Sequence, residues 1–388
     1  MIPRQLEPEL RLSAKKYPVV TVMGPRQSGK TTLVRNTFKA KPYVNLEIPE
    51  TLELAEYDPK AFFSHYPEGA IIDEIQKCPK LLSYIQGIVD ESDQKGQFIL
   101  TGSQQLSLSE GITQSLAGRT AVLTLLPLTI EELKRESLLK KTTDEILLTG
   151  FFPRIYRDDL DPVKASGNYI QTYLERDVRQ LINLKDFRSF QRFLKLCAGR
   201  IGQLLNYQNL SNEVGVSSHT IKHWIAVLEM SFIIHILPPY FGNIGKRTVK
   251  SPKLYFTDTG IASYLLDIRT PEQLNRDPLR GSLFENLVVN EMLKNNYNLE
   301  KQLVFYFFRD SSGKEVDLLY KEGANFKTFE VKSSSTFHKS FYKNLHDFEQ
   351  LSKERSSLGT LVYSGDDLPI SRGVRAINFK DISTIFEE

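Results

Sequence analysis

The chain has 388 residues, of which 40% are hydrophobic and 25% charged, a composition typical of globular proteins and a length that exceeds one ordinary core. The net charge of +3 is too small to indicate a surface dominated by nucleic-acid phosphates, and the polar start MIPRQLEPELRLSAKK lacks the apolar core of an export signal. No stretch approaches the roughly 18 apolar residues of a membrane span, so we expect a cytoplasmic protein of two or three domains with no membrane partner. The two cysteines, Cys78 and Cys197, stand in unrelated contexts and support neither a disulfide framework nor a zinc site.

The first motif that carries chemistry follows an apolar run at residues 19–23, VVTVM, which predicts a buried parallel strand. The next segment, GPRQSGKT, fits the pattern G-x-x-x-x-G-K-[ST] without a mismatch, and a helical segment continues it, which is the order that a phosphate-binding P-loop requires. A chance match is expected roughly once in a hundred chains of this length. The residues expected to bind the nucleotide are Gly24, Pro25, Arg26, Gln27, Ser28, Gly29, Lys30, Thr31 and Thr32.

The residue types in this loop match the chemistry of a bound triphosphate. Gly24 and Gly29 allow the backbone N–H groups and the helix N-terminus to face the phosphates. Lys30 places a positive charge at the β- and γ-phosphates, and Thr31 offers a hydroxyl to Mg²⁺. Thr32 is the weaker candidate for a metal ligand.

Two further strands are expected to end at the same site. Residues 70–72 form an apolar run that leads into Asp73 and Glu74, a Walker B pattern in which Asp73 holds Mg²⁺ and Glu74 polarises the attacking water. A surface acidic turn is the alternative interpretation. Residues 98–100 lead into Thr-Gly-Ser, where Ser103 is the candidate sensor of the γ-phosphate, although turn chemistry explains the same letters equally well.

The segments GPRQSGKTTL, AIIDEIQK, LTGSQQ and SLAGRTAVLTLLPLTIEEL resemble a group of prokaryotic AAA-type ATPases. The resemblance continues through TGFFPRIY, YLERDV, YFTDTG and GSLFENLVVNEML into a C-terminal region that is described in that group only as a domain of unknown function. It implies a parallel sheet with helices on both faces, a helical lid, and self-association into a ring such as a hexamer. ATP is preferred over GTP, because the segment NLKD at residues 183–186 lacks the lysine of the guanine-reading N-K-x-D pattern.

A ring would give Arg119 the role of an arginine finger, since AAA proteins commonly place such an arginine after a helical segment and before a strand. The alternative is an ion pair with a carboxylate in its own subunit. Arg154 and Arg176 are weaker candidates for the finger.

The middle of the chain predicts a winged-helix domain, with helices near residues 193–205 and 207–213 and a third helix capped by Ser217 or Ser218. Ile221, Trp224, Ile225 and Leu228 form the core-facing stripe of this third helix. Two β-prone runs, residues 232–236 and 254–256, follow it and are joined by a basic loop. If the domain binds DNA, Ser217, His219 and Lys222 approach a groove while Lys246, Arg247 and Lys250 meet phosphates; a packing module is the alternative.

The last part of the chain predicts a β-hairpin, in which EVDLLY at residues 315–320 pairs with TFEVK at residues 328–332. Period two puts Glu330 and Lys332 on one face, and pairing brings Asp317 beside them, with Glu285 on the preceding helix. This arrangement resembles the PD-(D/E)XK nuclease fold, in which two carboxylates bind Mg²⁺ and a lysine assists the water. The usual proline before the first aspartate is absent, because Val316 stands there.

The sequence therefore predicts an α/β protein with an AAA-type P-loop ATPase core and lid at residues 1–188. A winged helix at 189–253 and a restriction-endonuclease-like α/β domain at 254–388 are expected to follow. The predicted catalytic residues are Lys30, Glu74, Arg119, Asp317, Glu330 and Lys332; the predicted metal ligands are Thr31, Asp73, Glu285, Asp317 and Glu330. The leading expected function is an ATP-hydrolysing, Mg²⁺-dependent machine acting on DNA, and the alternative is a signalling or scaffold switch with an inactive nuclease-like domain. Whether the C-terminal domain cuts DNA or only binds stays open at this point.

Overall fold

The computed structural model describes residues 2–103, 115–173, 187–241, 248–323, 325–352, 359–371 and 373–387. The chain divides into two compact units. The first comprises Met1–Leu128, Met230–Phe232 and Tyr297–Glu300, and the second comprises Thr129–Glu229, Ile233–Asn296 and Lys301–Glu388. This division lies elsewhere than the predicted boundaries after residues 188 and 253. The second of these falls inside strand β7 (Lys253–Phe256), which pairs antiparallel with β6 (Ile234–Leu237).

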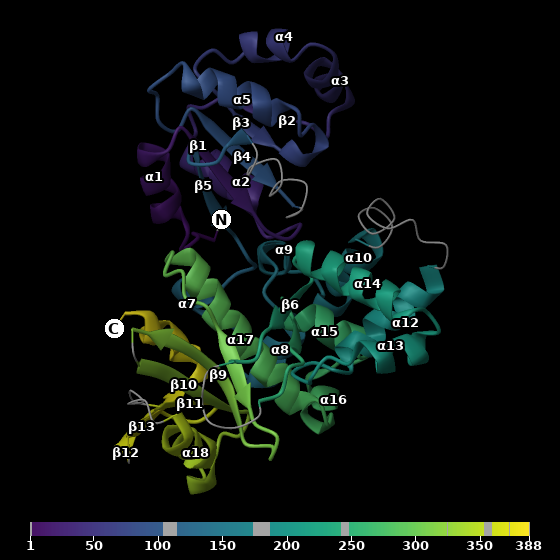
Figure 1. Ribbon diagram of the computed structural model, residues 1–388, viewed down its shortest axis with the longest axis vertical. Helices are drawn as coiled ribbons and strands as arrows, with labels where there is room; N and C mark the ends of the chain where they lie inside the picture. The colour runs from purple at the N-terminus through teal and green to yellow at the C-terminus, as the bar shows by residue number, and fades with distance from the viewer. Residues whose placement is uncertain are drawn as a thin grey trace. The chain divides into compact units, whose positions relative to one another are not determined.

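The first unit has an α/β fold built on a parallel sheet of five strands in the order β2-β3-β4-β1-β5 (Figure 1). The sequence prediction of a parallel α/β sheet is confirmed. Its elements are α1 (Glu7–Lys16), β1 (Val19–Met23), α2 (Lys30–Thr37), β2 (Tyr43–Asn45), α3 (Pro49–Tyr57), α4 (Pro59–Ser64), β3 (Ile71–Asp73), the 3₁₀ turn η1 (Ile75–Lys77), α5 (Leu81–Asp90), β4 (Phe98–Gly102) and β5 (Thr120–Thr124).

Burial on both faces explains why β1 is a continuous apolar run. All of its residues are buried. Val20 and Val22 lie two positions apart and so point to the same face of the sheet, where they pack with Leu10 of α1 and Leu33 of α2 in one hydrophobic cluster. This packing places the start of α2 at the carboxyl end of β1. In a parallel sheet of this kind, ligands bind at that edge.

The second unit begins with helices around a buried carboxylate. Asp258 caps α15 (Thr259–Leu265) by accepting the Ile261 N–H at 3.1 Å, and it also accepts the Phe151 N–H at 2.7 Å. Gly150, with φ +67°, lies so close that a Cβ there would come within 2.3 Å of Asp258 Oδ1. Burial raises the pKa of Asp258, and the two backbone donors oppose that rise. The segments TGFFPRIY and YFTDTG are therefore joined by backbone hydrogen bonds to one side chain, a structural role for both motifs.

The elements of this helical part include three helices and two strands near the predicted positions, but the first helix, predicted near residues 193–205, spans Phe187–Ala198, and Leu204 instead forms a β-bridge with Lys253. The bounds are α7 (Ile130–Arg135), α8 (Thr143–Thr149), α9 (Pro153–Arg157), α10 (Pro162–Tyr173), α12 (Phe187–Ala198), α13 (Tyr207–Val214), α14 (Ser218–Met230), β6, β7, α15 (Thr259–Leu265), α16 (Pro271–Arg276) and α17 (Arg280–Asn298). Ile221, Trp224, Ile225 and Leu228 of α14 are buried, which confirms the predicted core-facing stripe. The winged-helix fold itself stays a prediction, since residues 242–247 of the connecting loop lie outside the described residues.

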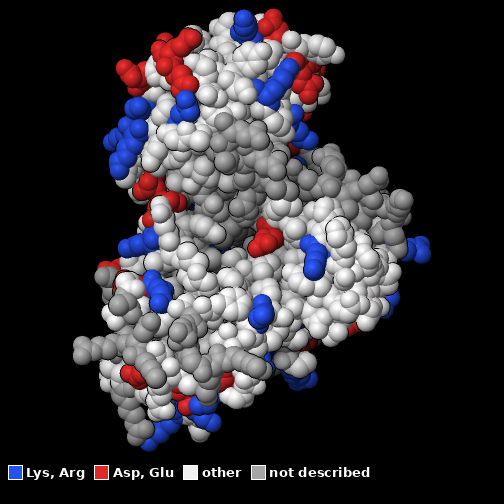
Figure 2. Space-filling model, viewed as in Figure 1, with Lys and Arg blue, Asp and Glu red and all other residues white. Residues whose placement is uncertain are grey.

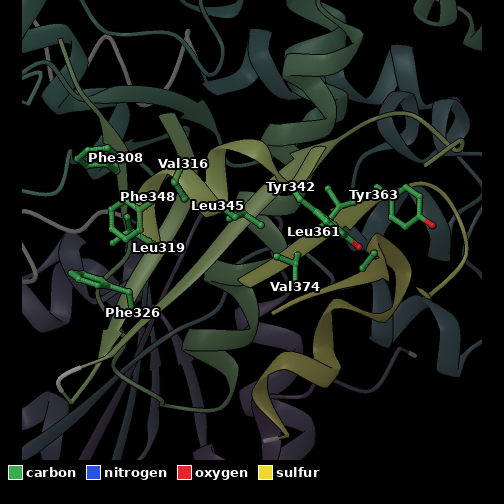
Figure 3. Close-up of a cluster of buried hydrophobic side chains, with 11 residues drawn as sticks. Phe308, Val316, Leu319, Phe326, Tyr342, Leu345, Phe348, Leu361, Tyr363 and Val374 are labelled. Carbon is green, nitrogen blue, oxygen red and sulfur yellow. The ribbon is translucent and has the colours of Figure 1, made fainter. Parts of the chain in front are cut away.

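The C-terminal part of the second unit holds a six-stranded mixed sheet in the order β12-β13-β11-β10-β9-β8. Its elements are β8 (Tyr306–Arg309), β9 (Glu315–Glu322), β10 (Asn325–Lys332), η3 (Lys339–Tyr342), α18 (Lys343–Ser352), β11 (Gly359–Tyr363), β12 (Leu368–Ser371), β13 (Val374–Asn378) and η4 (Phe379–Phe386). Strands β9 and β10 pair antiparallel, as the predicted hairpin requires. Figure 3 shows Leu345 and Phe348 of α18 meeting Phe326 and Leu361 of the sheet in a buried cluster.

The surface of the described residues mixes both signs of charge. On the face visible in Figure 2, Lys and Arg side chains are interspersed with Asp and Glu. Among the described helices, none has both the length and the apolar character that crossing a membrane demands.

Candidate active site

The loop between β1 and α2 has the backbone of a phosphate cradle. Gly24 has φ +151°, and a Cβ there would lie 2.1 Å from the Leu125 carbonyl oxygen, so only glycine fits. Gly29 is left-handed with φ +95° and precedes α2, which begins at Lys30. Two glycines thus bend the loop around the helix N-terminus, where unpaired N–H groups and the helix dipole favour an anion.

Side chains hold this loop in place. Lys30 is buried, and its ammonium donates to the carbonyl oxygens of Gly24 at 2.9 Å and Pro25 at 2.7 Å. The Arg4 guanidinium donates to the Ser28 carbonyl at 2.6 Å and to the Leu126 carbonyl at 2.7 Å, which ties the loop to the end of β5.

The side chains of the remaining predicted loop residues differ in their surroundings. Arg26 pairs with Glu47 at 3.6 Å, Gln27 is left-handed with φ 61°, and Thr32 is exposed on α2. The Ser28 hydroxyl is buried without a hydrogen-bond partner among the described residues. An orphaned hydroxyl inside a cradle of backbone donors fits a phosphate oxygen.

Asp73 ends β3, the strand between β2 and β4, and its carboxylate meets three hydroxyl groups. Thr31 donates to its carboxylate at 2.9 Å, Tyr43 of β2 donates at 2.7 Å, and Thr101 of β4 donates to the other oxygen. Burial raises the pKa of Tyr43, and its hydrogen bond to Asp73 raises it further, so this phenol stays a neutral donor. The three hydroxyl groups therefore orient the Asp73 carboxylate without placing a positive charge beside it.

Glu74 follows in a left-handed conformation with φ 58°, which turns the chain sharply at the strand end. Its carboxylate accepts a hydrogen bond from Ser103 at 3.2 Å and another from the Gln76 amide. Gln76 also donates to Ser103 at 3.2 Å, so these three side chains form one polar group. The structure thus brings Lys30, Thr31, Asp73, Glu74 and Ser103 to one edge of the sheet.

Sequence reasoning missed three residues that orient the carboxylates, namely Tyr43, Thr101 and Gln76. Thr101 and Gln76 stand next to predicted site residues in LTGSQQ and AIIDEIQK, so their positions were a usable signal. Tyr43 carries no such signal, because it lies 30 residues before Asp73 and reaches it only through the pairing of β2 with β3.

Arg119 pairs with Asp90 of the same unit, with a second contact at 2.9 Å from its other nitrogen. This is the ion pair weighed above as the alternative, and the finger role across a subunit boundary stays a prediction. Arg154 pairs with Asp158 at 3.2 Å. Arg176 lies outside the described residues.

The predicted C-terminal cluster is partly assembled around the hairpin. Asp317 accepts the Val331 N–H at 2.8 Å, and Glu330 accepts from Lys332 at 2.6 Å and from Asn344 of α18 at 2.9 Å. Burial raises the pKa of Asp317 well above its usual range, and the neighbouring Glu330 adds to the rise. Burial also raises the pKa of Glu330, against the opposing effect of Lys332.

Glu285, the third expected metal ligand, is already engaged by other side chains. The Lys253 ammonium lies 2.9 Å from Glu285 and 2.5 Å from Glu315, and the Tyr255 hydroxyl donates to Glu285 at 2.6 Å. Burial by itself would lower the pKa of Lys253, but Tyr255 and the surrounding carboxylates raise it well above its usual value. In the described part of the chain, no group of three or more His, Cys, Asp and Glu side chains is arranged to hold a metal ion.

The arrangement around Glu285 therefore differs from the expected three-carboxylate metal site, because the ammonium group of Lys253 pairs with this carboxylate. Sequence reasoning missed Lys253 and Tyr255. These two residues lie two positions apart in KLYF, so their side chains point to the same face of β7. This spacing does not predict that both side chains contact Glu285.

The residues expected to meet DNA are exposed where they are described. Ser217, His219 and Lys222 lie at the start of α14, and Lys250 follows the connecting loop. The Lys222 ammonium lies 5.6 Å from the centre of the Tyr207 ring. Lys246 and Arg247 lie outside the described residues.

The parallel sheet, the loop GPRQSGKT and the carboxylates that follow β3 define a P-loop ATPase domain of the AAA type, and residues 16–134 match the family described as AAA domain. Residues 140–272 and 280–382 match two families described as domains of unknown function, DUF8612 and DUF4143.

Two mycobacterial proteins, uncharacterized protein Mb2031c of Mycobacterium bovis and uncharacterized protein Rv2008c of Mycobacterium tuberculosis, are each 30% identical over 336 residues, which is 86% of this chain and 74% of each relative. The chain belongs to the same family as these proteins, and its N-terminal domain is an AAA-type P-loop ATPase domain.

Two solved structures show partial similarity at low sequence identity. A Walker-type ATPase of Pyrococcus abyssi has a TM-score of 0.46 and 17% identity, covering 68% of this chain and 96% of that chain. AMPPCP-bound DnaA from Aquifex aeolicus has a TM-score of 0.31 and 14% identity, covering 58% of this chain and 85% of that chain.

Proposed function

We propose that this chain binds ATP with Mg²⁺ in the loop at residues 24–31, hydrolyses it, and uses the hydrolysis cycle to act on DNA. The observation that carries the first part is the contact between Thr31 and Asp73, whose oxygens lie 2.9 Å apart at the end of the phosphate cradle. A hydroxyl and a carboxylate in this position are the hard oxygen donors that Mg²⁺ prefers. When bound, Mg²⁺ would supply charge neutralisation at the β- and γ-phosphates.

Lys30 and Glu74 have distinct roles in this proposal. The Lys30 ammonium would exchange its two loop carbonyls for phosphate oxygens, which are stronger acceptors for a cation. Glu74, oriented by Ser103 and Gln76, would accept the proton of the attacking water. Both donors to Glu74 are uncharged side chains, so they orient its carboxylate without adding a positive charge beside it.

The DNA part of the proposal rests on the exposed polar start of α14 and on the cations around it. Ser217, His219 and Lys222 are exposed there, and a helix preceded by a second short helix is a common way to present side chains to a groove. Self-association into a ring, with Arg119 reaching a neighbouring nucleotide, belongs to the same proposal and rests on the resemblance to AAA-type ATPases.

The test is an ATPase assay of the full chain without nucleic acid and with single-stranded DNA, double-stranded DNA and RNA. The Glu74→Gln variant, purified identically, controls for contaminating hydrolases. We expect hydrolysis that DNA accelerates more than RNA does, with an acceleration that falls as salt rises, because phosphate contacts release counterions. Hydrolysis that no nucleic acid changes, together with no DNA binding at low salt, would reject the DNA part and leave the ATPase part standing.

A second candidate function, a signalling or scaffold ATPase switch with an inactive nuclease-like domain, is favoured by one observation. Lys253 is buried between Glu285 and Glu315, so an internal cation already compensates Glu285, one of the carboxylates that a nuclease would use for metal. A screen of linear, single-stranded and branched DNA with Mg²⁺ or Mn²⁺ separates the two candidates, because only an active nuclease cleaves in a metal-dependent way.

A further inference from the structure

A pocket of about 380 Å³ opens in the first unit beside the nucleotide site. It is lined by residues of α2, of the turn that follows α2, and of the neighbouring strands β2 and β3. Thr31 lines it, so the pocket adjoins the residues that would hold Mg²⁺. We call it the Arg35 pocket, after the cation on its α2 wall.

The lining of the Arg35 pocket is cationic. Arg35, Lys39 and Lys41 contribute positive side chains, and the residues that line the pocket include no carboxylate. Burial lowers the pKa of Lys41 while the nearby Glu68 raises it, and the Lys41 ammonium donates to the Gln97 carbonyl at 3.0 Å. Arg35 and Lys39 are exposed, so two exposed cations face a concave surface that also holds the half-buried Lys41. Such a surface concentrates anions.

Tyr43, which lines the Arg35 pocket, contacts Asp73, the Walker B aspartate. The Arg35 guanidinium lies 4.5 Å from the centre of the Tyr43 ring, and the Tyr43 hydroxyl donates to Asp73 at 2.7 Å. Stacking uses the face of a guanidinium and leaves its N–H edge for hydrogen bonds. An anion bound to that edge would therefore be one side chain away from the group that orients Asp73.

We propose that the Arg35 pocket binds a small phosphate-bearing anion through Arg35 and Lys39 while nucleotide occupies the P-loop. The volume matches the lower part of the range for small-ligand sites, roughly 300–1,000 Å³, and does not suit a macromolecular surface. Two exposed cations with a third behind them favour a doubly charged anion, and a guanidinium edge binds phosphate oxygens in pairs. The phosphate group has two possible sources, free inorganic phosphate or a mononucleotide such as AMP.

The position of Tyr43 gives this site a second consequence. An anion that draws the Arg35 guanidinium away from the Tyr43 ring allows this ring to move. The hydrogen bond from the Tyr43 hydroxyl to Asp73 then changes in geometry. Binding in the Arg35 pocket is then coupled to the metal site, and by linkage the nucleotide complex and the anion alter each other's affinity equally.

The experiment is isothermal titration of the full chain with the P-loop first saturated by a non-hydrolysable ATP analogue and Mg²⁺. Inorganic phosphate is titrated in one arm and AMP in the other. The test variant is Arg35→Ala with Lys39→Ala; the matched control, Arg11→Ala with Lys60→Ala, removes the same two side-chain types from exposed positions on α1 and α4. Thermal unfolding verifies that both variants are folded, and Arg35→Lys serves as a milder variant if the double change is not.

We expect wild type and control to bind one of the two probes and the test variant to bind it about tenfold more weakly or worse, the loss of one or two charged hydrogen bonds. Phosphate binding would identify free phosphate as the source, and AMP binding without phosphate binding would identify a mononucleotide. Equal binding by test and control variants would overturn the proposal, as would no binding of either probe by wild type. Weaker binding of the ATP analogue in the test variant, with no probe bound in wild type, would instead make the pocket part of the nucleotide site.

A second measurement addresses the coupling to Asp73. Tyr43→Phe keeps the ring that faces Arg35 and removes the hydroxyl that reaches Asp73. We expect this variant to bind the probe as wild type does, while saturating probe changes the ATPase rate of wild type and not that of the variant. A probe-dependent rate change of the same size in both proteins would contradict the coupling through Tyr43.

Discussion

The two units hold their carboxylates in opposite ways. At the nucleotide site, Asp73 accepts hydrogen bonds from three hydroxyls and Glu74 from a serine and an amide, and within the described residues neither carboxylate has an ion-pair partner. At the C-terminal cluster, Glu285 and Glu315 share the ammonium of Lys253, and Glu330 pairs with Lys332.

The two sites differ in how much carboxylate charge is left without an ion-pair partner and can attract a divalent cation. Neutral donors orient a carboxylate and leave its charge in place, so the site still attracts a metal. A buried ammonium compensates the charge itself, and a metal must then displace it or work with the remaining groups. Among the described residues the nucleotide site thus has no cation paired with its carboxylates, as the proposed binding of Mg²⁺ requires, whereas much of the charge of the C-terminal cluster is balanced within the chain.

The largest expected effect is that of Lys30→Ala. We expect ATP binding to weaken by about 2–5 kcal/mol, roughly 30- to 5,000-fold, because triphosphate charge loses its nearest cation. Turnover should disappear with binding. Titration with a fluorescent ATP analogue measures this, and wild-type affinity in the variant would remove Lys30 from the site.

Glu74→Gln should separate binding from chemistry at the same site. We expect ATP to bind as in wild type and turnover to fall about 10²- to 10⁴-fold, because glutamine keeps the hydrogen-bonding shape but cannot accept the proton. Parallel measurements of analogue affinity and phosphate release test this. Near-normal hydrolysis would refute the role of Glu74 as the base.

Lys253→Met tests the other half of the comparison. It leaves the partly buried Glu285 without its cation, whereas Glu315 keeps Arg309 at 3.0 Å. We therefore expect the second unit to lose about 2–3 kcal/mol of unfolding free energy at neutral pH. Adding Glu285→Gln should restore most of this loss, because the carboxylate that lacks a cation is then removed. Denaturant unfolding measures all three proteins.

Asp73→Asn is the matched control in the first unit. Since no cation pairs with Asp73 in the described part of the chain, we expect this change to cost far less stability than Lys253→Met. A loss as large as that of Lys253→Met would contradict the distinction between the two carboxylate sites.

Asp317→Asn should have a small effect on stability whose sign depends on pH. The folded chain keeps the Asp317 proton at pH values where the unfolded chain has lost it, since the pKa is raised well above the ordinary value of 3.8. Wild-type stability should therefore fall as pH rises above that value, and the asparagine variant should fall less. Denaturant unfolding of both proteins between about pH 4 and pH 8 measures the difference between the two pH dependences.

The same variant tests the nuclease hypothesis. ATPase activity should survive Asp317→Asn, because the P-loop lies in the other unit. Metal-dependent DNA cleavage by wild type that the variant lacks would support an active nuclease. Cleavage that is unchanged in the variant would point to a contaminant.

Arg119→Ala should give the smallest change in the unfolding free energy of the subunit, because the Arg119–Asp90 pair is exposed to solvent. The informative measurement mixes this variant with Lys30→Ala. If Arg119 acts on a neighbouring nucleotide, the mixture should recover part of the hydrolysis that both variants lack alone. Confirmed co-assembly without any recovery would count against a shared site.

The sequence by itself determined the features that depend on neighbours along the chain. The strand predicted at residues 19–23 coincides with β1, the loop follows it, and α2 begins at Lys30, because backbone and phosphate geometry constrain consecutive residues. The hairpin of β9 and β10 is equally local, and its pairing brings Asp317 to the backbone of Val331.

Only the tertiary structure decided which side chains complete each cluster. Tyr43 and Thr101 reach Asp73 because β3 lies between β2 and β4, an order that crossover connections permit but that no spacing in the sequence specifies. Lys253 meets Glu285 and Glu315 from a strand outside the hairpin sheet. Long-range packing thus gives Asp73 hydroxyl partners and Glu285 an ammonium partner, and this decides which of the two carboxylates has an ion-pair partner within the chain.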